Sequence, residues 1–261
     1  MFGDTKNITM KLRLIILIVL AGILFFFNLG ATSLWDPDEP RQAIMAREMM
    51  DRDDYIRPYL NGVPYLEKPP FYSWMIIIAA KAAGTVNEFA SRAPSALAAL
   101  LLVVVTFLLG CKLGDERAGF LSGLVLATNY QFLSNARESV MDMTFAFFIG
   151  LSIYLAFVSL EKDKRFAFVL SFVPGAFAIL TKGPAGLVIP AGVVIFLLIF
   201  KGQFKRYIVH LILGCVLATA IAAIWFLLAG EAYIREFVFH QNFTRYTNAF
   251  DHSESPWYYF H

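Results

Sequence analysis

LIILIVLAGILFFFNL, residues 14–29, is an apolar run without a single Asp, Glu, Lys or Arg. Two further runs of this kind occupy residues 96–110 and 184–200. Across the chain 58% of residues are hydrophobic and the mean hydropathy is +0.62, whereas soluble domains reach about 45–50% apolar residues even when glycine is counted. Long uncharged runs are typical of membrane helices. We therefore predict an all-α polytopic membrane protein.

The charge pattern predicts how these helices cross the membrane. We expect seven spans, at residues 14–33, 93–111, 118–134, 143–160, 167–181, 184–200 and 207–230. Basic residues precede the first span and fill three short loops: Lys6, Lys11 and Arg13, then Lys112 and Arg117, then Lys162, Lys164 and Arg165, and last Lys201, Lys205 and Arg206. Short basic loops stay in the cytoplasm. Seven spans place all four basic segments there, so the N-terminus is predicted inside.

One apolar stretch, residues 71–80, is too short to be a further span. Its ten residues would extend about 15 Å at 1.5 Å per residue, against a hydrocarbon core of about 30 Å. Counting it would also move three basic loops to the outside. We predict instead an amphipathic juxtamembrane helix in the first outer loop, with Tyr72 and Trp74 as interfacial aromatics.

Composition and the N-terminus narrow the class of protein further. The net charge of only +2 gives no indication of nucleic-acid binding. Cys111 and Cys215 lie in apolar runs, so we expect them to pack rather than to form a disulfide or a zinc site. Lys11 and Arg13 before the first run, with small residues at 30–33, also fit a signal peptide. The many later spans favour a retained first helix.

Four segments share the predicted outer face: 31–92, 135–142, 182–183 and 231–261. The first contains Asp36, just before Pro37, and Asp38 and Glu39 between Pro37 and Pro40. Carboxylates placed at the membrane surface can accept a proton from a substrate or hold a cation. The alternative is structural, since Asp38 would also suit the N-cap of a helix over 40–51.

Further candidates follow along the outer segments. Glu67 and Lys68 precede two prolines and sit on rigid backbone, which suits a phosphate-binding lysine or, alternatively, a surface ion pair. Asp142 begins a predicted helix and could simply cap it. Lys182 stands alone in an outer hairpin, as a functional cation or a snorkelling end residue. His240, His252 and His261 lack a firm metal-ligand spacing.

Taken together, and in order along the chain, these segments resemble one family. They resemble the bacterial 4-amino-4-deoxy-L-arabinose lipid A transferases and the protein O-mannosyltransferase-like enzymes, all members of the type C glycosyltransferase superfamily. The matching residues are Leu34-Trp35, Pro37-Asp38-Glu39, Arg41, Ala46-Arg47-Glu48-Met49, Tyr65, Glu67-Lys68-Pro69, Asp142, Thr181-Lys182-Gly183, Asn242, Arg245-Tyr246 and Pro256-Trp257-Tyr258-Tyr259.

The resemblance implies membrane helices with juxtamembrane helices in the first outer loop, and inverting sugar transfer from a polyprenyl-phosphate donor. By position Asp38 resembles the catalytic carboxylate and Asp142 the second acidic residue of the site. Lys68 and Arg245 resemble the groups that hold the donor phosphate, with Tyr65 and Lys182 lining the same cavity. Glu67 resembles a residue that helps to bind a divalent metal ion in the aminoarabinose enzymes.

Two features depart from the family pattern. Asn242 stands where the aminoarabinose enzymes carry a metal-binding histidine, which weakens both the metal site and that sugar assignment. The chain of 261 residues is also about half the family's length, so we expect one N-terminal transmembrane module, 1–261, without the C-terminal part of the family fold.

The resemblance implies a multi-pass protein of the bacterial inner membrane whose site faces the periplasm or exterior. A lipid (lipid A-like), glycan or protein would be the acceptor, and membrane lipids would surround the helices. Two alternatives remain from the residues alone. A transporter or flippase would place its charges near the membrane midplane, often in broken helices of repeated halves. A non-catalytic membrane scaffold is the other.

Overall fold

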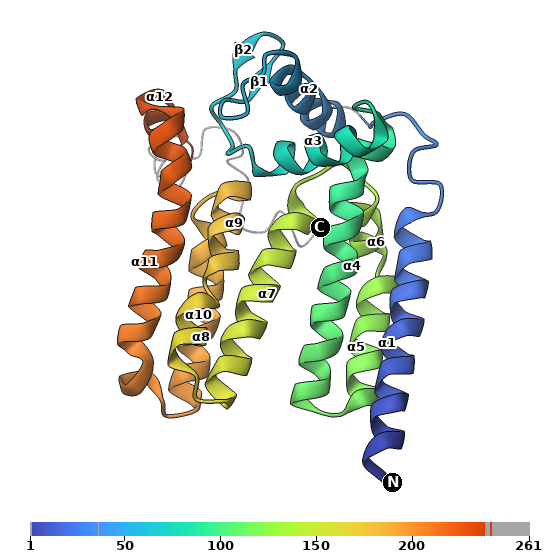
Figure 1. The fold of residues 1–261 in the computed structure, drawn as a ribbon, viewed down its shortest axis with the longest axis vertical. Helices are drawn as coiled ribbons and strands as arrows, with labels where there is room; N and C mark the ends of the chain where they lie inside the picture. The colour runs from blue at the N-terminus through green and yellow to red at the C-terminus, as the bar shows by residue number, and fades with distance from the viewer. Residues whose placement is uncertain (1, 36, 238–240, 242–261) are drawn as a thin grey trace, which may run out of the picture.

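The computed structural model describes residues 2–35, 37–237 and 241, with side chains from residue 8 onward, and its helices run mostly along one axis (Figure 1). One group of helices along this axis comprises α1 (Phe2–Phe26), α4 (Glu88–Leu113), α5 (Glu116–Thr128) and α6 (Tyr130–Ala136). The other comprises α7 (Asp142–Glu161), α8 (Arg165–Leu170), α9 (Val173–Lys182), α10 (Ala185–Phe200) and α11 (Phe204–Ala229). Each group encloses its own apolar core, and α7 packs against α4 where the groups meet. The predicted all-α membrane fold is confirmed.

Among the described residues, five helical segments are long and apolar enough to cross a membrane: Ile8–Phe26, Glu88–Leu113, Asp142–Glu161, Arg165–Lys182 and Phe204–Ala229. The expected span 118–134 is instead interrupted between α5 and α6 at Asn129, whose side chain caps α6. The expected span 184–200 is α10, which has 16 residues. Both follow the common axis (Figure 1), while the total of seven spans stays a prediction.

The first helix differs most from its predicted bounds. It ends at Phe26 rather than at residue 33, because Asn28 takes a left-handed backbone conformation (φ 56°). The last carbonyl groups of a helix need outside donors. Arg137 Nη1 supplies them from the segment after α6, 2.9 Å from the Leu24 carbonyl and 2.9 Å from that of Phe27. A guanidinium also complements the negative end of the helix dipole.

Close helix contacts depend on glycine where α4 meets α5. A Cβ added to Gly110 would lie 2.8 Å from Gly119 Cα, and one added to Gly119 would lie 2.4 Å from Cys111 Sγ. Small residues let helix backbones approach in this way in membranes. Cys111 and Cys215 are both free and half-buried, as expected for residues that pack between helices.

One end of the bundle carries the outer elements: α2 (Asp38–Asp51), the short hairpin of β1 (Tyr59–Leu60) and β2 (Val63–Pro64), and α3 (Phe71–Ala83). Figure 1 shows α3 lying across this end, with α2 and the hairpin beyond it and α12 (Glu231–Tyr233) beside them. The hairpin turns at Asn61 and Gly62, both with positive φ. Asn-Gly is the pair that such two-residue turns favour.

The juxtamembrane helix is confirmed, but one of its predicted anchors is not. Tyr72 is fully buried and lies 2.8 Å from Ser95 Oγ and 3.3 Å from the Ser91 carbonyl of α4. It therefore joins α3 to the bundle instead of facing the interface, because the helix buries that side against α4. Trp74 is half-buried and donates to the Tyr55 carbonyl at 2.6 Å.

The basic loops lie together at the opposite end. The α4–α5, α7–α8 and α10–α11 connections and the N-terminus all gather there (Figure 1), as the charge pattern predicts. Several of their charges are paired at that end, with Arg13 3.5 Å from Glu116 and Lys112 3.7 Å from Glu161. The separation into a basic end and an outer end is thus a property of the fold.

This separation yields a test of orientation. In intact cells a membrane-impermeant maleimide should label Val63→Cys, which is exposed on the hairpin, and should label Lys164→Cys in the α7–α8 loop only after permeabilisation. Short basic loops are retained in the cytoplasm. Labelling of position 164 from outside, with position 63 protected, would reverse the predicted topology. Replacing Cys111 and Cys215 with alanine removes background labelling.

Candidate active site

A cavity of about 170 Å³ opens at the outer end of the bundle. Its lining residues are Asp38, Arg41, Gln42, Tyr65, Lys68, Val140, Met141, Asp142 and Lys182. They come from α2, the segment after the hairpin, the start of α7 and the end of α9. Residues that are more than a hundred positions apart in the chain therefore meet at one place, and they include five of the seven residues that sequence analysis selected.

The helix α2 presents Asp38 to the cavity from its first turn. Asp38 does not act as the N-cap, because α2 begins at Asp38 itself, the cap is Pro37 and no side chain caps the helix. Its carboxylate lies 3.6 Å from Arg41 Nη1, one turn along. Gln42 completes this face, since positions three and four apart on a helix are neighbours. That spacing from Asp38 was the signal in the sequence for Arg41 and Gln42, to which no role had been assigned.

Asp142 and Lys182 form an ion pair in the wall of the cavity. Asp142 is the first residue of α7 and makes no capping bond, since the N-cap is Met141. Instead Lys182 Nζ donates to Asp142 Oδ1 at 2.5 Å. The lysine is presented at the end of α9, where Gly183 (φ 95°) turns the chain. The structure thus pairs this lysine with the second acidic residue, and the capping alternative for Asp142 is wrong.

Tyr65 stands between this cavity and a neighbouring one. The second cavity, of about 280 Å³, is lined by Arg41, Leu60, Val63, Pro64, Tyr65 and Glu67. Tyr65 donates its hydroxyl to Glu67 Oε2 at 3.1 Å, and its backbone N–H is held by the Pro58 carbonyl at 2.8 Å. Burial and the adjacent Glu67 carboxylate raise the pKa of Tyr65 to about 12. The phenol therefore stays protonated at neutral pH and acts as a donor.

The described residues do not test the predicted metal site. Glu67 is exposed and engaged by the Tyr65 hydroxyl. No group of three His, Cys, Asp or Glu side chains that could hold a metal ion occurs within 2–35, 37–237 and 241. A divalent cation prefers several oxygen or nitrogen ligands, so Glu67 would need further ligands and its metal role stays a prediction. Arg245, Asn242, His240, His252 and His261 lie outside the described residues.

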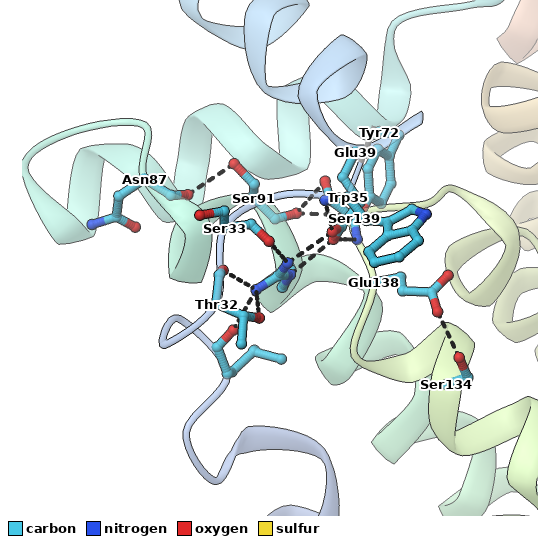
Figure 2. A network of polar contacts seen from close by, with 12 residues as sticks. Thr32, Ser33, Trp35, Glu39, Tyr72, Asn87, Ser91, Ser134, Glu138 and Ser139 are labelled. Atoms are coloured by element: carbon cyan, nitrogen blue, oxygen red, sulfur yellow. Dashed lines mark hydrogen bonds and ion pairs between the residues drawn. The ribbon is translucent and has the colours of Figure 1, made fainter. Parts of the chain in front are cut away.

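Glu39, the neighbour of Asp38 in sequence, lies in a buried polar network (Figure 2). Its carboxylate accepts from Arg92 Nε at 2.8 Å and from Arg92 Nη2 at 2.7 Å. It also accepts from the backbone N–H groups of Trp35 at 2.7 Å and Ser139 at 2.6 Å. Glu39 is 2% exposed and Arg92 5%. Sequence analysis missed Arg92, because an arginine near the end of a span also fits a snorkelling role.

Across the described spans, charged side chains stay near the helix ends. No Asp, Glu, Lys or Arg occurs in residues 14–35, 93–111, 118–136, 143–160, 166–181, 183–200 or 207–230. A transporter would be expected to place charges near the midplane. The described residues instead bring two carboxylates and three basic side chains together in one cavity at an end of the bundle.

Known proteins resemble this chain in both sequence and fold. A family model described as dolichyl-phosphate-mannose-protein mannosyltransferase matches residues 67–226, more than half of the chain. The chain belongs to this family. It is therefore a member of the type C glycosyltransferases, as the sequence motifs indicated. The matched region contains Glu67, Lys68, Asp142 and Lys182, whereas Asp38 precedes it.

Relatives extend the similarity over nearly the whole chain. An uncharacterized protein of Aquifex aeolicus is 35% identical over 88% of this chain and 46% of its own length. The undecaprenyl phosphate-alpha-4-amino-4-deoxy-L-arabinose arabinosyl transferase 2 of Proteus mirabilis is 28% identical over 97% of this chain and 47% of its own. The chain thus spans about half the length of the curated relatives it matches.

A solved structure shows the same arrangement of helices. The crystal structure of ArnT from Cupriavidus metallidurans bound to undecaprenyl phosphate superimposes with a TM-score of 0.83 at 28% identity, over 94% of this chain and 47% of that one. The polytopic helical fold with its outer elements is therefore that of a membrane glycosyltransferase.

The buried Glu39 carboxylate makes stability depend on pH in a defined direction. Burial raises its pKa, but the bonds from Arg92, Trp35 and Ser139 outweigh burial and hold the pKa below its ordinary value. A lowered folded-state pKa contributes stability that is fully present above the unfolded value, near 4.3, and is lost as pH falls through the folded value. The difference in Tm between the wild type and Glu39→Gln in detergent should therefore be constant near neutral pH and shrink only in acid.

Asp51→Asn is the control for this measurement. Asp51 is exposed at the other end of α2, and surface substitutions usually change stability by no more than about 0.5 kcal/mol. A Tm difference for Glu39→Gln that grows as the solution is acidified would contradict the lowered pKa.

Proposed function

We propose that this chain carries the donor site of a glycosyltransferase at the extracytoplasmic face of the bacterial inner membrane. The protein would transfer a sugar from a polyprenyl-phosphate donor to a lipid A-like lipid, a glycan or a protein. The observation that carries this proposal is the cavity that places Asp38 and Asp142 beside Lys68, Lys182 and Arg41. The solved relative with the same fold was crystallised with undecaprenyl phosphate.

The cavity suits the reacting end of such a donor. A polyprenyl phosphate remains in the bilayer and presents its phosphate at the surface, where α3 lies across the end of the bundle (Figure 1). At about 170 Å³ the cavity is smaller than the roughly 300–1,000 Å³ of typical small-molecule sites. We therefore expect it to receive only the phosphate and sugar end of the donor, while the prenyl chain stays in lipid.

The basic residues would hold the phosphate and stabilise its charge as it leaves. Lys68 binds as a point charge, and Arg41 can offer two parallel N–H groups to phosphate oxygens. Arg245 is proposed for the same role by its position in the family motif. Lys182 is held by Asp142 at 2.5 Å, so it can be moved towards the phosphate only if that ion pair loosens. Fixed cations at a site of developing charge lower the barrier to reaction.

Asp38 would act as the general base. The acceptor hydroxyl or amine attacks the anomeric carbon, the bond from that carbon to the phosphate oxygen breaks, and the phosphate leaves with the bonding electrons. The attacking group must lose its proton, and Asp38 accepts it. The Asp38 side chain is 68% exposed and its one described ion-pair partner, Arg41, is 3.6 Å away, so the carboxylate can reach an incoming acceptor.

Two sugar classes fit this proposal. Relatives named for 4-amino-4-deoxy-L-arabinose favour an aminopentose, and the family description names mannose. Incubation of the full-length membrane protein with polyprenyl-phosphate pentoses and hexoses, followed by mass spectrometry of lipids and proteins, would identify donor and acceptor. Absence of transfer from every polyprenyl-phosphate sugar would overturn the proposal.

The base assignment predicts the behaviour of Asp38→Asn. Turnover by the full-length enzyme should fall by about 10²–10⁴-fold, the usual contribution of general-base catalysis, while donor binding is retained. Asp51→Asn is the matched control, since it makes the same change on the same helix outside the cavity. Wild-type turnover by Asp38→Asn would eliminate the base role, because an amide cannot accept the proton.

The phosphate assignment predicts the behaviour of Lys68→Ala. Binding of polyprenyl phosphate should weaken roughly 10–100-fold, because hydrogen bonds to charged groups contribute about 1.5–3 kcal/mol. Lys68→Arg should rescue only in part. Lys81→Ala removes an exposed lysine from α3 outside the cavity and should bind donor normally. Unchanged affinity in Lys68→Ala would refute this role.

A further inference from the structure

We propose that Arg92 and Ser95 of α4 are positioning residues that set the separation of Asp38 and Asp142 across the cavity, through Glu39 and the 139–140 backbone. This inference rests on the proposed function of those two carboxylates. Neither Arg92 nor Ser95 lines the cavity. They act from behind it, on the segments that carry the two acidic residues.

On the Asp38 side of the cavity, Arg92 holds the segment that precedes α2. The Arg92 guanidinium binds both oxygens of Glu39, the residue next to Asp38. It also donates hydrogen bonds to the carbonyl oxygens of Leu29 at 3.0 Å, Thr32 at 2.8 Å and Ser33 at 2.9 Å. Residues 29–33 of the connection from α1 to α2 are therefore held by one buried side chain of α4, which limits the freedom of the first turn of α2 to move.

On the Asp142 side of the cavity, α4 holds the backbone that precedes α7. The Ser139 N–H donates to Glu39 Oε1 at 2.6 Å, and its hydroxyl donates to the Ser91 carbonyl at 2.8 Å. One residue on, the Val140 carbonyl accepts from Ser95 Oγ at 2.7 Å. Val140 and Met141 then line the cavity and lead directly to Asp142. Two consecutive turns of α4 thus anchor the backbone that starts α7.

Glu39 connects the Asp38 side of the cavity to the Asp142 side. Its Oε1 is shared by Arg92 Nε and the Ser139 N–H, and its Oε2 by Arg92 Nη2 and the Trp35 N–H. Figure 2 shows these bonds converging on one carboxylate. A displacement of the guanidinium would therefore move both Asp38 and Asp142 relative to each other. Reactions in enzymes are sensitive to such shifts, since a misplacement of about 1 Å can reduce the rate about 10²-fold.

The test uses Arg92→Lys and the milder Ser95→Ala in the full-length protein. Lysine keeps the charge but lacks the planar fork that binds two carboxylate oxygens and three carbonyls at once. We expect kcat per folded molecule to fall roughly 10–100-fold for Arg92→Lys and less for Ser95→Ala, with KM for the donor changed by less than about threefold because the phosphate-binding residues remain.

A double-mutant cycle separates positioning from general stability. If Arg92 acts through Asp38, Arg92→Lys should cost little further kcat once Asp38 is already Asn. Multiplicative losses in the double mutant would refute the connection. The matched control is Ser152→Ala, because Ser152 is also fully buried and donates to a backbone carbonyl at 2.7 Å, that of Ser171, remote from the cavity. It should leave kcat unchanged.

A second measurement does not depend on sugar transfer. Asp38→Cys and Asp142→Cys, in a background with Cys111→Ala and Cys215→Ala, should be joined by a short bifunctional thiol reagent. Adding Arg92→Lys or Ser95→Ala should lower the crosslinking yield, whereas Ser152→Ala should not. Unchanged yield together with unchanged kcat overturns the inference. Reduced crosslinking yield, with a full-length wild-type protein that transfers no sugar from any polyprenyl-phosphate donor, would uphold the inference and would instead reject the proposed function.

Discussion

The outer half of the molecule depends on one buried carboxylate, that of Glu39. Burying a charge is costly unless it is paired and hydrogen-bonded, and Glu39 satisfies this condition with the Arg92 fork and two backbone N–H groups. Removing either member of a buried pair costs about 3–5 kcal/mol, because the other charge is left unpaired. The buried Glu39–Arg92 pair lies where α1, α2, α4 and α7 must be held in one arrangement. The same network separates two adjacent acidic residues, with Glu39 inside and Asp38 at the cavity.

The membrane-spanning helices and the end of the bundle that carries the basic loops were predictable, because lipid imposes simple rules on hydropathy and charge. Uncharged runs and basic short loops indicated which segments cross and which end they share, and the structure places those loops together (Figure 1). What could not be read from hydropathy was the interruption at Asn129 and the end of α1 at Phe26. The first depends on the hydrogen bond of the Asn129 side chain, and the second on the left-handed backbone at Asn28 together with Arg137, which binds the helix end from more than a hundred residues away. Hydropathy sums over windows and does not register such bonds.

The candidate site was predictable in its members but less so in its geometry. Sequence motifs indicated Asp38, Tyr65, Lys68, Asp142 and Lys182 as candidates, and these five residues line one cavity. Capping was the structural alternative for Asp38 and Asp142, and neither side chain makes a capping bond. The Asp142–Lys182 pair could not be inferred, because it requires the start of α7 and the end of α9 to lie at the same height. Arg92 was missed because burial, rather than residue type, distinguishes it from a snorkelling arginine.

The start of α2 carries an exposed carboxylate, Asp38, and a buried one, Glu39. This difference explains why the site can remain partly open. The proposed general base, Asp38, must be reached by an acceptor, and its side chain is exposed with a single described ion-pair partner, Arg41. A base so exposed has little packing of its own to fix its direction, and side-chain entropy would spread it over several rotamers. Its backbone must then be fixed from elsewhere. The buried network supplies that rigidity from behind, which allows precision and access at the same membrane surface.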